Sequence, residues 1–137
     1  MQGNDSRLAT VATAWTPEIR FGGVADDGAK TLSSNKYVRV GKFVELEGRF
    51  AWTSFGTKTG VVTIAGIQVA ASSQAAIPAG MAVFTTGGAS IAGAVIVRIV
   101  ESTIYLDFQG TTAVTSLTHA NFSNTSDLRF SMRYTAA

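Results

Sequence analysis

One segment decides the fold: Phe43-Val44-Glu45-Leu46-Glu47-Gly48-Arg49-Phe50-Ala51-Trp52. Every second position holds an apolar residue or glycine, namely Val44, Leu46, Gly48, Phe50 and Trp52. The alternate positions hold Glu45, Glu47 and Arg49, with Phe43 and Ala51 at the two ends. Because successive side chains of a strand point to opposite faces, this pattern predicts a strand with one buried and one wetter face.

A β-hairpin is predicted where this strand begins. Tyr37–Val40 reads as a short strand, and Gly41-Lys42 suits a two-residue turn with glycine at its first position. The same alternation recurs at residues 127–134, 103–109 and 94–100, and more weakly at 18–22, 61–67 and 81–86. Turn-forming residues separate these segments, at 22–23, 26–28, 33–35, 56–60, 87–88, 101–102 and 121–126.

About eight short strands in one chain of this length predict an all-β fold, an antiparallel β-sandwich of the jelly-roll kind. We expect this domain to span residues 15–137. The residues before it are small, polar and weakly patterned, so residues 1–14 are predicted to be a connecting segment.

Two predicted strands are apolar on both faces. Along residues 94–100, Val95 and Val97 share one face, while Ile96 and Val100 lie on the other beside Arg98. The tract at 61–67 has the same character. Both faces of such a strand need cover, which favours an oligomer. The residues expected at a subunit interface are Ile96, Val100, Val62, Ile64 and, at the domain entry, Trp15.

Composition excludes several classes of protein. The chain has 137 residues, of which 46% are hydrophobic and 15% charged, which suits a folded domain. Its net charge is +2 and its basic residues are scattered, so no nucleic-acid partner is expected. It has no Cys, which rules out disulfides and thiolate metal sites. No apolar run suits a secretory leader or a membrane-spanning helix, so neither export by a leader nor membrane insertion is expected.

No catalytic, metal or cofactor site is predicted. His119 is the one histidine and lies in a polar turn, with no sign of a nucleophile or of further metal ligands. Glycosidases use two carboxylates, and Glu45 with Glu47 on one strand face is a candidate pair, although a solvated strand face is the favoured interpretation. Asp26 with Asp27 reads as a turn, and Asp107 with Glu101 is a third pair.

Four stretches in order carry a resemblance. They are WTPEIRFGG at 15–23, YVRVGKFVELEGRF at 37–50, VTIAGI at 62–67 and LTHANFSNTSDLRFS at 117–131. Together they resemble the C-terminal domains of bacteriophage tail fibres and tailspikes, although Gln68 stands where that family commonly has proline. GNDSRL at residues 3–8 is similar to a phrase found near the end of fibre shafts.

This resemblance implies a homotrimeric β-sandwich at the end of a fibre, in which residues 1–14 lead from the shaft. It implies a virion tail protein that is made in the host cytoplasm and acts outside the cell. The implied partners are other tail proteins and a host-surface polysaccharide or outer-membrane receptor. The family has no motif for receptor-binding residues, so none is carried over.

Sugar binding is the site hypothesis that the residues themselves support. Proteins hold sugars with exposed aromatic faces and with carboxylate, amide or guanidinium groups beside them. By strand phase the best constellation is Tyr105, Asp107 and Gln109. A second is Arg129 and Arg133 around Ser131, and a third is Tyr37 with Arg39. The favoured alternative is that these faces are ordinary solvent surface or lie in a subunit seam.

The expected function is therefore host-glycan recognition together with fibre trimerisation. Three alternatives stay open. The first is a trimerisation cap or baseplate fibre without a ligand, the second is a small polysaccharide depolymerase, and the third is a capsid decoration protein.

Overall fold

The computed structural model describes residues 11–68, 70–72, 77–89, 91, 94–109 and 113–137. Within these ranges the chain forms strands and one 3-10 turn, η2 (His119–Asn121), and no α-helix. The strands are β1 (Val11–Ala14), β2 (Glu18–Phe21), β3 (Val24–Ala25), β4 (Ala29–Val40), β5 (Phe43–Ser54), β6 (Val62–Ala65), β7 (Ile77–Thr86), β8 (Val95–Val100), β9 (Thr103–Gln109), β10 (Val114–Ser116) and β11 (Asp127–Thr135). The prediction of an all-β domain is confirmed.

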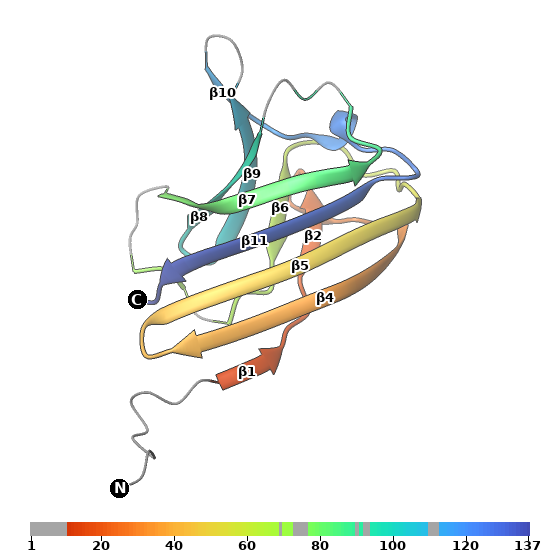
Figure 1. Ribbon diagram of the computed structural model, residues 1–137. Helices are drawn as coiled ribbons and strands as arrows, with labels where there is room; N and C mark the ends of the chain where they lie inside the picture. The colour runs from red at the N-terminus through yellow and green to blue at the C-terminus, as the bar shows by residue number, and fades with distance from the viewer. Residues whose placement is uncertain (1–10, 69, 73–76, 90, 92–93, 110–112) are drawn as a thin grey trace, which may run out of the picture.

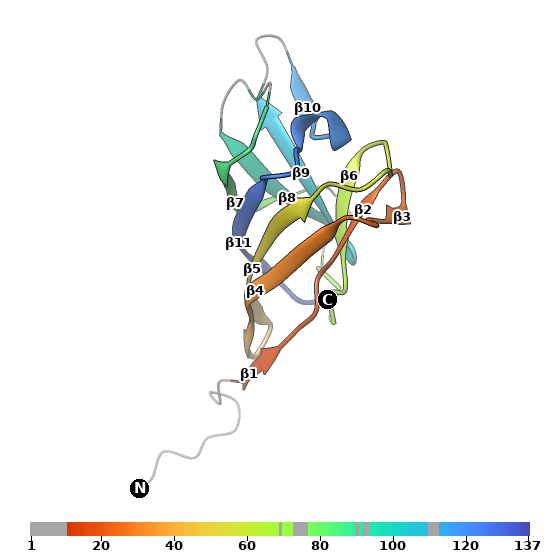
Figure 2. The same ribbon diagram turned by 90° about the vertical axis from the view of Figure 1, so that its right-hand side faces the viewer.

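The strands form one continuous antiparallel sheet in the order β1-β4-β5-β11-β7-β8-β9-β6-β2-β3, with β10 on β9. The long strands β4, β5, β11 and β7 lie side by side across the front of Figure 1. The sheet curls, so that in Figure 2 β2 and β6 lie on one side of the molecule and β7 and β11 on the other. The curl gives the sheet an inner face around the core and an outer face toward solvent.

The alternation along residues 43–52 predicts correctly which side chains lie on the inner face. In β5, Val44, Leu46 and Phe50 are at most 1% exposed, while Glu45 on the other face is exposed. β11 repeats the pattern, with Leu128 completely buried in the same core cluster. Strands from both ends of the sheet order supply the rest of the core, so long-range pairing and burial of apolar side chains hold the fold together.

The β4–β5 hairpin turns as predicted. Val40 pairs with Phe43 across Gly41-Lys42, and Gly41 has φ +60°, a left-handed conformation that glycine adopts without strain. The stretch at 33–35, expected as a turn, instead lies inside β4. Ser34 there has φ 54° and the register with β5 shifts between Ser33 and Lys36, which marks a β-bulge.

The first described residues of the chain pack against this hairpin. Residues 11–14, predicted as part of the connecting segment, form β1 and pair with β4. Trp15 follows and is 4% exposed. Its indole N–H donates to the backbone oxygen of Glu47 at 2.9 Å, and its ring meets the Phe130 ring edge-on. Trp15 therefore packs against its own chain, which corrects its assignment to a subunit interface.

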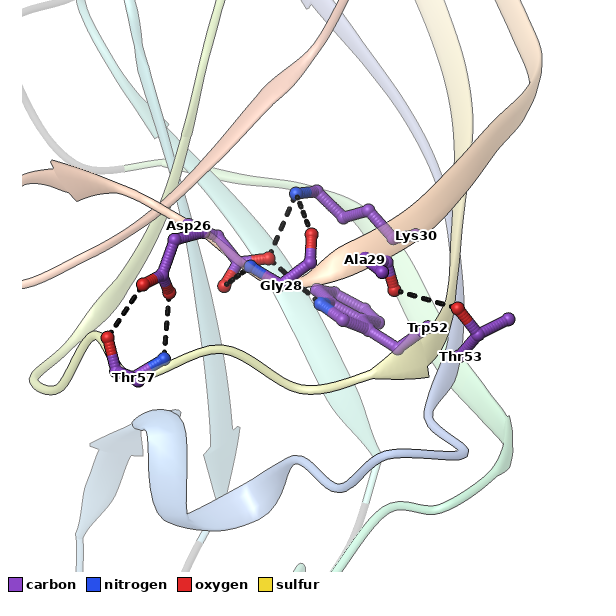
Figure 3. A network of polar contacts seen from close by, with 8 residues as sticks. Asp26, Gly28, Ala29, Lys30, Trp52, Thr53 and Thr57 are labelled. Atoms are coloured by element: carbon purple, nitrogen blue, oxygen red, sulfur yellow. Dashed lines mark hydrogen bonds and ion pairs between the residues drawn. The ribbon is translucent and has the colours of Figure 1, made fainter.

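A buried carboxylate in the turn before β4 bonds to side chains of β4 and β5 at one end of the sheet (Figure 3). The Asp26 side chain is 1% exposed and lies 2.9 Å from the Lys30 ammonium. It accepts hydrogen bonds from the indole N–H of Trp52 at 2.9 Å and from the Gly28 N–H at 3.1 Å. These bonds satisfy a charge that would otherwise be costly to bury.

The neighbouring Asp27 holds the β5–β6 loop. Its carboxylate accepts hydrogen bonds from the hydroxyl of Thr57 at 2.6 Å and from the Thr57 N–H at 2.7 Å. These bonds, the hydroxyl bond above all, lower the pKa of Asp27 below its ordinary value. The 26–28 turn is thus bonded to β4 and β5 through Asp26 and to the β5–β6 loop through Asp27.

Candidate functional site

Three adjoining hollows cross the outer face of the sheet over β4, β5, β11 and β7, the strands at the front of Figure 1. The hairpin hollow, beside the β4–β5 turn, has a volume of about 190 Å³. The middle hollow has about 270 Å³ and the wide hollow about 440 Å³. Glu45 and Arg133 line both the hairpin and the middle hollow, and Met81 and Ser131 line both the middle and the wide hollow. We call this run of hollows the outer groove.

The two-residue turn determines which side chains line the hairpin hollow. The turn makes Phe43 the first residue of β5, on the outer face, where it is 69% exposed. Two residues later Glu45 projects from the same face. Glu45 lies directly between Val38 of β4 and Arg133 of β11 in the strand register. An exposed aromatic ring, a carboxylate and a guanidinium group thus line one hollow.

Glu45 and Arg133 are both available to a ligand. Opposite charges on directly paired residues usually form an ion pair. Among the residues that the structure describes, however, neither side chain makes a hydrogen bond or an ion pair. The hollow therefore offers a free acceptor and a free donor next to an aromatic face. This set suits a sugar, because hydroxyls can bond to the charged groups and a C–H face can rest on the ring.

The charges farther along the outer groove are already paired. Arg49 holds Asp127 with two hydrogen bonds, Nε to Oδ1 at 3.0 Å and a terminal guanidinium nitrogen to Oδ2 at 2.6 Å. The bonds from Arg49 lower the pKa of Asp127 below its ordinary value. Arg129 approaches the same carboxylate at 3.6 Å, yet its side chain is 52% exposed. Glu47 lies 4.0 Å from the Lys36 ammonium.

Of the three predicted sugar-binding constellations, that of Arg129 and Arg133 lies open. Both are exposed on the outer face of β11, with Ser131 between them, and both line the outer groove. Sequence reasoning did not select Phe43 and Glu45 as their partners. The signal was present, because both share the wetter face of β5.

Tyr37 and Arg39 do not form an outward site, which corrects the third constellation. Tyr37 pairs with the buried Leu46 and is itself 4% exposed, so it belongs to the inner face. The guanidinium of Arg39 donates through Nε to the backbone oxygen of Gly41 at 2.8 Å.

Tyr105, Asp107 and Gln109 are engaged by the protein itself. Asp107 is 4% exposed and accepts from Arg98 Nε at 2.6 Å and from the Ser116 hydroxyl at 2.8 Å. The Arg98 guanidinium carbon lies 4.3 Å from the centre of the Tyr105 ring. Gln109 also has an interaction partner. Because Arg98 covers the Tyr105 ring and binds Asp107, this cluster stabilises the sheet rather than presenting a stacking face.

The predicted interface residues divide into two groups. Val62 and Ile64 are completely buried in the core of their own chain, which corrects their assignment. The outer face of β6 carries the smaller Thr63 and Ala65 instead. Ile96 and Val100 are half-buried on the outer face of β8. Ile96 pairs with Met81 of β7, which is 62% exposed.

His119 has a structural partner. The ring Nδ1 of His119 accepts a hydrogen bond from the Gly60 N–H at 2.9 Å. The backbone N–H of His119 donates to the Gly60 backbone oxygen at 3.1 Å. Within the described ranges, no three His, Asp or Glu side chains gather as a metal site would need. No helix in that part of the chain is long and apolar enough to cross a membrane.

No protein-family model matches this chain, and no curated protein matches it in sequence. The resemblance to tail fibres therefore rests on the sequence motifs alone, and the functional argument rests on the outer groove.

Proposed function

We propose that this protein is a non-catalytic attachment domain that binds a cell-surface polysaccharide in the outer groove. The observation that carries the proposal is the hairpin hollow, in which Phe43, Glu45 and Arg133 offer an aromatic face, a free acceptor and a free donor. Hydrogen bonds to charged groups are stronger than those between neutral groups, so two such groups give both affinity and orientation.

The resemblance to bacteriophage tail-fibre domains supplies the biological setting of this proposal. In that setting the curled sheet belongs to a jelly-roll-like sandwich, and three copies form the tip of a fibre that recognises the host. Ile96 and Val100, half-buried on the outer face of β8, are the contact residues that stay available for the trimer. Other tail proteins are then the upstream partners.

Removing either free charge is expected to abolish most of the binding. We expect Glu45→Gln and Arg133→Gln each to weaken polysaccharide affinity about tenfold or more, since a charged hydrogen bond contributes about 1.5–3 kcal/mol. Phe43→Ala is expected to act similarly by removing the stacking face. The measurement is retention of the purified domain and its variants on an array of bacterial surface polysaccharides.

The controls lie on β2 and in the turn between β8 and β9. Arg20→Gln and Glu101→Gln change exposed charges outside the outer groove and are expected to leave retention unchanged. Unchanged retention of the Glu45 and Arg133 variants would contradict the proposed site. A fall in polysaccharide length during the assay would favour the depolymerase alternative, in which Glu45 and Glu47 are the candidate carboxylates.

A second candidate function, a structural cap without a ligand, is favoured by exposed apolar side chains. Met81 and Val83, 62% and 54% exposed, lie on the outer face of β7, where Met81 pairs with Ile96 of β8. Apolar surface of this kind is typical of the centre of a subunit interface. This function predicts a trimer that Val83→Glu converts to a monomer in sedimentation equilibrium. A wild-type monomer at micromolar concentration would exclude the cap.

A further inference from the structure

The outer groove extends beyond the hairpin hollow, which holds Phe43, Glu45 and Arg133. Its three hollows share lining residues in succession, so they form one continuous track along β11 from Arg133 past Ser131 to Arg129. Four residues of an extended strand span about 13 Å. Arg129, at the far end of the wide hollow, therefore lies well beyond the reach of a sugar ring seated beside Phe43.

The far end of the track repeats the chemistry of the near end in a weaker form. Arg129 lines the wide hollow and keeps 52% of its side chain exposed, although it lies 3.6 Å from the Asp127 carboxylate that Arg49 also binds. Met81 and Val83 form an apolar flank on the β7 side. A guanidinium group beside an apolar flank can bind the hydroxyl or acidic substituents of a sugar and cover its C–H face.

We propose that the outer groove binds a linear polysaccharide in extended form, with consecutive sugars spread from the hairpin hollow to the wide hollow. This inference rests on the proposed function and adds the class of ligand: an internal stretch of a long chain, rather than a single sugar or a chain end. The hollows follow one another along β11 and share lining residues. An extended chain matches both features, whereas a monosaccharide would leave the wide hollow empty.

The test compares ligand lengths. The probe is the bacterial polysaccharide that the domain retains on the array, cleaved chemically and separated into disaccharides and octasaccharides. We expect the octasaccharide to bind at least about tenfold more tightly than the disaccharide in isothermal titration, because only the longer ligand reaches both ends. Arg129→Ala is expected to remove most of this gain. Arg20→Ala, which changes an exposed arginine outside the groove, is the matched control.

Each outcome decides the inference. Equal affinity for both lengths, or a gain that survives Arg129→Ala, would overturn it while the proposed function stands on the hairpin hollow alone. Retention of no polysaccharide at all would overturn the inference and the proposed function together. A gain with length that is lost in Arg129→Ala but kept in Arg20→Ala would support both.

Discussion

Replacing Trp52 with alanine is expected to lower the free energy of unfolding by about 4 kcal/mol, the typical cost of truncating a buried aromatic side chain. Trp52 is 4% exposed and lies at the centre of an aromatic cluster. Its ring centre is 5.2 Å from that of Phe122, 5.9 Å from Phe50 and 6.0 Å from Phe55. The measurement is urea unfolding followed by circular dichroism.

Two further variants give this prediction its contrast. Trp52→Phe keeps a ring in the cluster and removes the indole N–H that Asp26 accepts, so we expect a smaller loss. Phe43→Ala, at a residue that is 69% exposed, is expected to change stability by no more than about 0.5 kcal/mol. Equal losses at Trp52 and Phe43 would contradict the assignment of inner and outer faces.

Replacing Asp26 with alanine is expected to cost about 3 kcal/mol, because it leaves a partly buried ammonium and an indole N–H without their acceptor. Lys30 is 15% exposed at its side chain, so solvent replaces the lost carboxylate only in part. Asp26→Asn should recover part of the stability, since an amide oxygen still accepts from Trp52. Thermal unfolding of the variants provides the measurement.

The adjacent Asp27 supplies the control for Asp26. Its carboxylate bonds to Thr57 at the surface, so Asp27→Ala is expected to loosen the β5–β6 loop with little effect on global unfolding. An Asp27→Ala variant as unstable as Asp26→Ala would contradict the claim that the buried Asp26 contacts, rather than those of Asp27, stabilise this end of the sheet.

Strand phase could be predicted from the sequence where the alternation is long. The ten residues from Phe43 to Trp52 carry five repeats of the pattern, and burial along β5 follows it. The four residues from Tyr37 to Val40 carry too few, and Tyr37 was assigned to the wrong face. The predicted turn already determines the face of Tyr37, because pairing Val40 with Phe43 places Tyr37 opposite Leu46, on the inner face.

Long-range partners could not be predicted in the same way. Asp107 looks like an outward ligand by phase, yet Arg98 and Ser116 surround it once β8, β9 and β10 pair. By sequence, Val62 and Ile64 belong to a strand that is apolar on both faces and could be covered by another subunit. Their burial depends on β6 lying between β9 and β2, an order that local pattern does not contain.

The outer groove is a product of that order as well. Glu45 and Arg133 are 88 residues apart in the chain and become neighbours only when β11 inserts between β5 and β7. The sequence predicted that Arg133 faces outward and that Phe43 and Glu45 share a face. It did not predict that the three line one hollow.

The most direct test of the central claim is to map the ligand on the domain by amide chemical-shift perturbation with the retained polysaccharide fragment. The outer-groove account predicts perturbations along the β4–β5 hairpin and β11, centred on Phe43, Glu45 and Arg133, with the loops around Thr57 and His119 unchanged. Perturbations confined to those loops or to Tyr105 on β9, with the hairpin silent, would contradict it.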